Sequence, residues 1–182
     1  MNQDKHQNNN EHAPEASFEL TPAQLCRQSA IEYIGLGGKS SGKVRRKLDD
    51  LGFGYELIEA CLAKLQQDAY INDEALARRV LRDRRGRRAE SYAALIQRMQ
   101  NQGIPMHTAE SIVYNEAIQE YELLLEYLDE HAARELGDMA ELEAFSSEYQ
   151  SLLGRVGRRA EGRGFSAGMI HRAVKELLSY YE

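Results

Sequence analysis

The chain has 182 residues, of which 42% are hydrophobic and 29% are charged, and its net charge is −6. Ala, Leu and Glu each occur 21 times, whereas the β-branched residues Val, Ile and Thr together occur 16 times. Because strands favour β-branched residues and helices favour Ala, Leu and Glu, this composition excludes a mainly β fold and predicts an all-α protein. No apolar run approaches the roughly 18 residues that span a bilayer, and the N-terminus lacks a signal peptide's apolar stretch. We therefore expect a cytoplasmic protein without membrane contact.

The first predicted elements are a tail and a helix. Residues 1–17 lack apolar periodicity and are rich in Asn, Gln and Glu, which predicts a disordered N-terminal tail. Thr21, Pro22 and Gln24 match the cap, first and third positions of a helix with a capping box, and this helix should run to about Leu36. The residues expected to face inward are Leu25, Ile31 and Ile34.

Three further helices are indicated by capping residues and glycines. The first ends at Gly52, and the second covers about 55–67. Asn72 caps the third, which should run through Arg85 and end at Gly86. The inward-facing residues of the first two are expected to be Val44, Leu48, Leu51, Ile58, Leu62 and Leu65.

A weak internal repeat is centred on Gly52, Gly103 and Gly164, at spacings of 51 and 61 residues. Apolar residues recur eight and four positions before each glycine and one, six and ten positions after it. They are Val44, Leu95 and Val156; Leu48, Met99 and Ala160; Phe53, Ile104 and Phe165; Ile58, Ala109 and Ile170; and Leu62, Val113 and Val174. The repeat predicts three tandem three-helix, helix-turn-helix-like units in an elongated curved protein. The expected boundaries are 18–71, 72–117 and 118–182, the last unit beginning with an acidic helix.

The charged residues are unevenly distributed. Residues 78–88 hold seven arginines and one aspartate, which is typical either of a solvated helix face or of a site for an anionic partner. Residues 116–148 hold 11 acidic groups and a single basic one, Arg134, with an apolar stripe from Leu123 to Leu136. That acidic stretch is either an ordinary bundle helix with a solvated face, or a negative surface that docks a basic protein or shields the arginines from unwanted DNA.

The residue patterns offer little for catalysis. Residues 37–44 approach the phosphate-binding loop G-x-x-x-x-G-K-[ST], but Val44 replaces its hydroxyl residue and no strand precedes it, so these glycines are expected to break a helix. His131 and Glu135 share a helix face but are too few for a metal site. We therefore expect neither an enzyme nor a bound cofactor or metal.

The two cysteines, Cys26 and Cys61, lie far apart and form no CxxC pair. In a reducing compartment each is expected to fill the apolar face of a helix as a small hydrophobic residue, and not to form a disulfide.

Several motifs resemble the RecX family of regulatory proteins. The central segment 70–79 (YINDEALARR), then 82–84 and 102–104, is similar to the family's central signature. Residues 163–166 (RGFS), followed by Ile170, are similar to its closing motif. The order and spacing of these motifs carry the resemblance, which extends over most of the chain outside the tail.

This resemblance implies a protein that binds the RecA recombinase in the groove of its filament on single-stranded DNA, and we expect the protein to be a monomer. Such proteins lower the ATPase, strand-exchange and coprotease activities of RecA in DNA repair and the SOS response, and weak binding of double-stranded DNA is also expected. The candidate contact residues are Arg78, Arg79, Arg82, Arg84, Arg85, Arg87 and Arg88; Lys43, Arg45, Arg46 and Lys47; and Arg158, Arg159 and Arg163.

Two other functions stay open on the sequence. A helix-turn-helix module could bind DNA without RecA, although the helices after the three glycines begin with little positive charge. A structural scaffold would be compatible with the repeat alone.

Overall fold

The computed structural model describes residues 20–180, and within them it contains nine α-helices, one short 3₁₀ turn and no strand. The predicted all-α fold is therefore confirmed. The helices are α1 (Pro22–Ile34), α2 (Ser41–Asp50), α3 (Tyr55–Gln67), α4 (Asp73–Asp83), α5 (Tyr92–Asn101), α6 (Met106–Glu116), α7 (Glu120–Ala140), α8 (Ser147–Glu161) and α9 (Ala167–Leu178), and the 3₁₀ turn η1 is Gly86–Arg88. None of these helices combines the length and apolarity that crossing a membrane requires.

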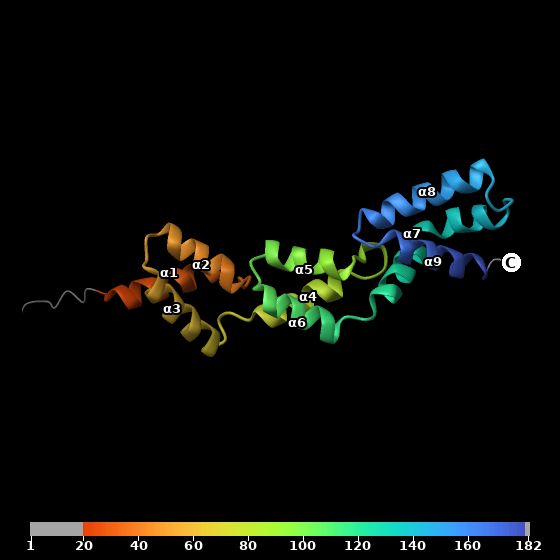
Figure 1. The fold of residues 1–182 in the computed structure, drawn as a ribbon. Helices are drawn as coiled ribbons and strands as arrows, with labels where there is room; N and C mark the ends of the chain where they lie inside the picture. The colour runs from red at the N-terminus through yellow and green to blue at the C-terminus, as the bar shows by residue number, and fades with distance from the viewer. Residues whose placement is uncertain (1–19, 181–182) are drawn as a thin grey trace, which may run out of the picture.

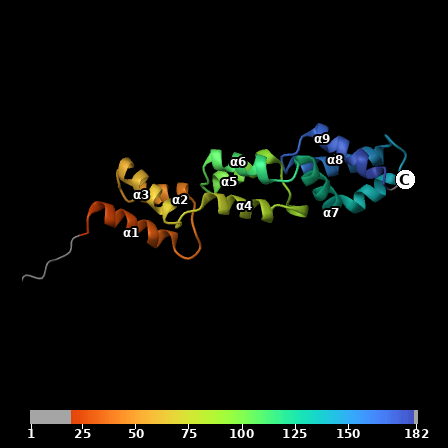
Figure 2. The same cartoon turned by 90° about the horizontal axis from the view of Figure 1, so that it is seen from below.

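The helices form three consecutive groups along an elongated molecule (Figure 1). The helices α1, α2 and α3 pack on one another, as do α4, α5 and α6, and then α7, α8 and α9. Figure 1 shows α2, α5 and α8 along its upper edge, and Figure 2 shows α1, α4 and α7 along one side. The first group encloses its own apolar core, whereas the second and third share a continuous core. The domain boundaries predicted from the sequence stay a prediction, and the tail at 1–17 lies outside the described residues.

The start of α1 has the predicted capping box. The Gln24 N–H donates to Thr21 Oγ1 at 3.3 Å, and the Thr21 N–H donates to Gln24 Oε1 at 2.8 Å. The helix ends at Ile34 and not at Leu36, because Gly35 leaves the helical conformation with a φ of +54°. Leu25 was wrongly expected to face inward, since its side chain is 45% exposed. The buried face of α1 is instead the stripe of Cys26, Ala30 and Ile34, spaced four residues apart.

Two further expectations at helix ends are wrong. Leu51 is 49% exposed, because it is the C-cap residue that follows the last turn of α2 and is not part of the buried face of the helix. The helix α4 ends at Asp83 and not after Arg85, and Gly86 opens the η1 turn with a φ of +53° instead of ending the helix. The acidic helix α7 holds this turn, because the Gly86 N–H donates to Glu126 Oε2 at 3.2 Å.

The three repeat glycines end α2, α5 and α8 in the same way. Gly52, Gly103 and Gly164 have φ values of +82°, +80° and +88°, and each N–H donates at 2.8 Å to the carbonyl three residues earlier. The N–H of the following apolar residue returns to the carbonyl five residues before it, as in a Schellman cap. All the repeat's apolar residues are buried except Phe53, which is half-buried. The sequence pattern therefore marks one turn geometry used three times.

The first group joins the second through the start of α2. The Ser40 hydroxyl donates to the Gln102 carbonyl at 2.6 Å, and the Ser41 N–H donates at 2.9 Å to Asp73, the first residue of α4. A Cβ on Gly103 would lie 2.7 Å from Ser40 Oγ. This joint therefore requires glycine at the end of α5.

The second group joins the third through the start of α5, in a similar way. The Ser91 N–H donates to the Arg163 carbonyl at 3.0 Å, and the Tyr92 N–H donates at 2.7 Å to Glu120, the first residue of α7. A Cβ on Gly164 would collide with Ser91 Oγ. In both joints, the start of a group's second helix meets the glycine turn and the first acidic residue of the next group.

The glycines of residues 37–44 serve this packing in part. Gly42 lies inside α2, so it does not break a helix as expected. Its N–H donates to the Gly103 carbonyl at 3.0 Å, and a Cβ on Gly42 would lie 2.5 Å from that oxygen. Glycine at this position allows the backbone of α2 to touch the end of α5.

Candidate partner and nucleic-acid interface

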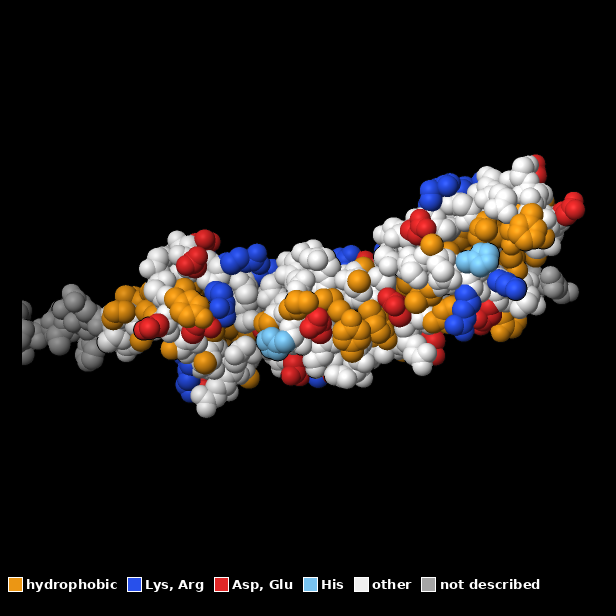
Figure 3. All heavy atoms as spheres, in the orientation of Figure 1, with side chains coloured by type: hydrophobic (Ala, Val, Ile, Leu, Met, Phe, Trp, Pro, Cys, Tyr) orange, Lys and Arg blue, Asp and Glu red, His pale blue; other side chains and the backbone are white. Residues whose placement is uncertain are grey.

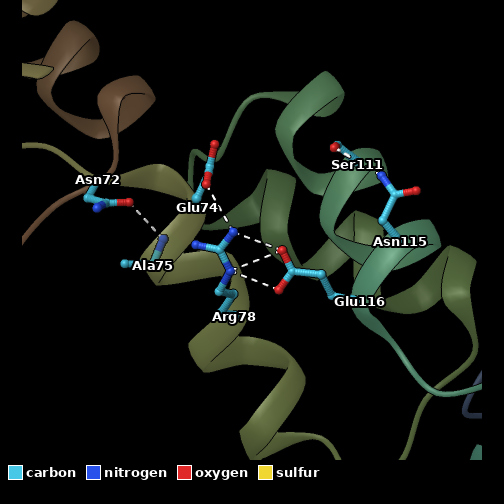
Figure 4. Close-up of polar contacts among 7 residues, drawn as sticks. All are labelled: Asn72, Glu74, Ala75, Arg78, Ser111, Asn115 and Glu116. Carbon is cyan, nitrogen blue, oxygen red and sulfur yellow. Dashed lines mark hydrogen bonds and ion pairs between the residues drawn. The ribbon is translucent and has the colours of Figure 1, made fainter.

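Arg78, the first arginine of the 78–88 stretch, forms its polar contacts within its own group of helices (Figure 4). Its Nε donates to both carboxylate oxygens of Glu116 at 2.8 and 3.1 Å, and its Nη2 donates to Glu74 Oε2 at 3.0 Å. The hydrogen bond with Glu116 raises the pKa of the Arg78 guanidinium and lowers the pKa of the Glu116 carboxyl. Arg78 thus links α4 to the end of α6.

The arginines around η1 contact the acidic helix α7. Arg85 forms a two-point ion pair with Glu126, with its Nε 2.9 Å from Oε2, and this contact lowers the pKa of Glu126. Arg87 Nε donates to the Glu130 carbonyl at 3.0 Å. Glu126 therefore compensates one of the arginines within the chain, which is the geometry that a shielding role of the acidic stretch requires. The apolar stripe of α7 is buried as predicted.

Three arginines of the stretch are exposed and form neither an ion pair nor a side-chain hydrogen bond within residues 20–180. They are Arg79, Arg82 and Arg88. The stretch thus divides into arginines that bind acidic groups of this chain and arginines that face outward.

The other two predicted sets divide in the same way. Arg45 pairs with Glu59 at 2.5 Å, and Arg159 pairs with Glu135 at 2.6 Å. The remaining members form no ion pair with the described residues, except Arg163, which is treated below. They are Lys43, Arg46 and Lys47 on α2 and Arg158 on α8. Figure 3 shows Lys and Arg side chains along the upper edge of the molecule, over α2 and over α8.

Sequence reasoning missed a cluster around Glu90. The Glu90 side chain is only 6% exposed, and three guanidinium groups surround it. Arg98 binds it through two hydrogen bonds of 2.7 and 2.5 Å, while Nη1 of Arg84 lies 3.9 Å and Nη1 of Arg163 lies 3.7 Å from Oε1. Arg84 and Arg98 lie within eight residues of Glu90, but Arg163 follows 73 residues after it, so no local motif indicates that all three converge. The nearest signal is the single acidic residue that separates the arginine stretch from the Ser91 helix cap.

The His131 and Glu135 pair has structural contacts of its own. The His131 ring stacks on Tyr127 with 5.1 Å between ring centroids, and Glu135 accepts a hydrogen bond from Arg159. Among residues 20–180, no group of three or more His, Cys, Asp or Glu side chains is placed to hold a metal ion.

The sequence relatives and the structural match carry the same protein name. No protein-family model matches the chain. Two relatives named Regulatory protein RecX are each 25% identical to it. The protein from Corynebacterium efficiens aligns over 158 residues, which are 84% of this chain and 71% of that protein. The protein from Prosthecochloris aestuarii aligns over 150 residues, which are 82% of this chain and 91% of that protein.

A solved structure has the same fold. The crystal structure of RecX from Lactobacillus salivarius matches with a TM-score of 0.67 at 18% identity, covering 85% of this chain and 96% of that one. Fold and site together define an elongated, all-helical protein whose candidate contact residues are exposed basic side chains. The two sequence relatives and this structural match support assignment of the chain to the RecX family.

Proposed function

We propose that this chain is a regulator that binds RecA and its filament on single-stranded DNA and lowers the ATPase, strand-exchange and coprotease activities of RecA. The names of the two relatives support a regulatory role. The observation that carries the proposal is the elongated array of helix groups whose exposed basic side chains lack partners within the described chain. We further propose that the protein acts as a monomer, by binding and not by catalysis.

The ion pairs narrow the proposed contact set. Arg78 and Arg85 are engaged by Glu116 and Glu126, so they are better placed to hold the fold than to meet a partner. The contact residues proposed here are those whose side chains form neither an ion pair nor a hydrogen bond with the described residues, which are Arg79, Arg82, Arg88, Lys43, Arg46, Lys47 and Arg158. Carboxylates that compensate neighbouring arginines weaken the attraction of bare DNA, which favours a partner that offers protein and DNA together.

The decisive experiment is the single-stranded-DNA-dependent ATPase of RecA, titrated with this protein. We expect inhibition well below one molecule per RecA monomer, because an elongated protein in the filament groove affects several subunits. Simple competition for DNA would require near-saturating amounts. No effect at equimolar protein, combined with good direct DNA binding, would contradict the proposal and favour the helix-turn-helix DNA-binding alternative.

A charge reversal tests the outward arginines. In Arg82→Glu, an exposed charge without an internal partner changes sign, and we expect half-inhibition to need on the order of tenfold more protein, equivalent to about 1.4 kcal/mol. The matched control is Arg134→Glu on α7, which makes the same change at an exposed arginine outside the proposed set. Circular dichroism should show equal helicity for both variants. Equal inhibition by both would remove Arg82 from the interface.

A further inference from the structure

We propose that the cavity between α5 and the end of α8 binds a phosphodiester of single-stranded DNA, and that α2 and α8 extend this site along the same edge. The central side chain is Arg163, which shares the buried carboxylate of Glu90 with Arg98 but forms no hydrogen bond with it. The proposal rests on the proposed function only for the identity of the ligand.

The charge balance at Glu90 leaves an excess of positive charge. One buried carboxylate faces the guanidinium groups of Arg84, Arg98 and Arg163, all within 4 Å. A guanidinium group stays charged at any ordinary pH, so the cluster carries a net charge of about +2. Arg98 uses Nε and one Nη for Glu90, whereas Arg163 approaches it only at 3.7 Å and is also 5.7 Å from the Tyr127 ring centroid. Arg163 therefore keeps hydrogen-bond donors for a ligand.

A cavity of about 360 Å³ opens beside this cluster. Ligand sites commonly have volumes in this range, and this one is lined mostly by polar groups. The lining side chains that can donate hydrogen bonds are Gln97, Arg98, Asn101, Gln102 and Arg163. Arginine forks combined with amide donors are the groups that proteins use to bind phosphate and sugar oxygens.

The cavity lies close to two basic helices, α2 and α8, whose own residues do not line it. At one end the backbone carbonyl of Gln102 accepts a hydrogen bond from the Ser40 hydroxyl, and the Lys43 side chain lies against the adjacent Gly103 turn. At the other end Arg163 lies two residues beyond the end of α8, and the exposed Arg158 lies in the last turn of that helix. A row of positive groups thus runs from α2 past the cavity to α8, along the edge visible at the top of Figure 1.

A row that spans all three helix groups fits a linear polyanion better than an acidic peptide. Single-stranded DNA carries one charge at every nucleotide, so it can meet successive basic positions in turn. A peptide would need acidic residues throughout a comparably extended segment. The amide side chains in the cavity can also form hydrogen bonds with the sugars and base edges of DNA. The carboxylates of an acidic peptide offer no such groups.

The test is the binding of fluorescein-labelled oligo(dT) to the full chain, measured by anisotropy at several salt concentrations without RecA. Arg163→Gln and Lys43→Gln should each lower the affinity about three- to tenfold, and each should make the slope of log K against log salt shallower by about 0.7. Arg172→Gln, which removes an exposed charge on α9, is the matched control and should keep the wild-type slope.

A second kind of variant, which should raise the affinity, distinguishes the loss of a contact from unfolding. Glu90→Gln keeps a hydrogen-bond acceptor for Arg98 but removes the negative charge, so oligo(dT) should bind more tightly and with a steeper salt slope. A gain in Glu90→Gln cannot come from a folding defect, since unfolding would lower the affinity for oligo(dT).

Three outcomes would overturn the proposal. They are wild-type slopes in both Arg163→Gln and Lys43→Gln, no gain in Glu90→Gln, or displacement of oligo(dT) by poly-glutamate at equal charge, which would indicate an acidic protein ligand. Because RecA is absent here, failure of the proposed function shows separately, in the ATPase titration.

Discussion

At the scale of single residues, the arginine-rich stretch is two populations with different physical roles. Guanidinium groups that face a carboxylate at hydrogen-bond distance, such as Arg78 and Arg85, link α4 and η1 to α6 and α7. Those without such a partner, such as Arg79 and Arg82, keep their charge for the surroundings. The charge of each residue is evident from the sequence, but its partner is not, because Glu116 and Glu126 follow about 40 residues later.

The Arg85–Glu126 ion pair predicts a dependence of stability on pH. Since the hydrogen bond from Arg85 lowers the pKa of Glu126 below its ordinary 4.5, the folded state holds this proton less tightly than the unfolded chain. The stabilisation is therefore present above about pH 4.5 and is lost as the pH falls through the lowered pKa. Glu126→Gln should unfold at a lower temperature at pH 7 and lose less stability on acidification. The exposed control Asp129→Asn on the same helix should follow the wild type, and identical acid profiles for all three would contradict the prediction.

The buried cysteines predict unreactive thiols. Burial raises the pKa of the Cys26 thiol to about 12, and Cys61 is buried as well, which confirms the prediction that both are core residues. A thiol with a raised pKa carries almost no thiolate at neutral pH, and the thiolate is the reactive form. Ellman's reagent should therefore leave Cys26 unlabelled in the native protein. Burial should also keep the reagent from Cys61, and both cysteines should be labelled in denaturant. Rapid labelling of two thiols in the native state would show this core to be open.

At the scale of elements, the three glycine turns are the feature that sequence reasoning located best. Apolar residues at fixed distances from Gly52, Gly103 and Gly164 proved buried or half-buried, and the shared Schellman turn is one that commonly packs the residue after the glycine on the preceding helix. Helix faces and ends were less predictable where tertiary contacts decide them. Leu25 lies beside the buried stripe of α1 and is exposed, and the end of α4 depends on Glu126 of a distant helix.

The turns also supply a matched pair of substitutions. Gly52→Ala and Gly103→Ala both place a Cβ at a φ near +80°, which costs roughly 1–2 kcal/mol. At Gly52 the new Cβ meets nothing within 4 Å, whereas at Gly103 it lies 2.7 Å from Ser40 Oγ and 3.0 Å from the Lys43 nitrogen. Urea denaturation should therefore show a further loss of about 1–3 kcal/mol for Gly103→Ala. Equal losses of unfolding free energy in the two variants would mean that the contact between α2 and the end of α5 accommodates the extra Cβ without destabilisation.

At the scale of the whole molecule, the candidate site depends on how the helix groups are joined. Arg98 and Arg163 reach the same carboxylate only because the start of α5 docks on the turn after α8. Sequence reasoning predicted the all-α fold and included Arg84 and Arg163 among the candidates. It could not find Glu90 or Arg98, because their importance comes from a contact between groups.

The separate core of the first group predicts separable unfolding. Asp73, which is buried, accepts the Ser41 N–H and helps to join α1–α3 to the rest. Asp73→Ala removes a hydrogen bond to a charged group, worth about 1.5–3 kcal/mol, at this joint. Hydrogen exchange followed by mass spectrometry should show faster exchange in α1–α3 and unchanged protection in α7–α9. The exposed control Asp50→Ala should leave both unchanged. Uniformly faster exchange along the chain would show that the three groups unfold as one unit.

The two similar joints also determine how the protein gains length. Each joint consists of a capped helix start, a glycine turn and an acidic first residue, so the contact is complete within two neighbouring groups. Insertion or removal of a three-helix group therefore changes the length of the molecule without requiring new chemistry at the joints that remain. For a chain built in this way, the number of groups, and not any single side chain, determines how many subunits of a periodic partner it can span.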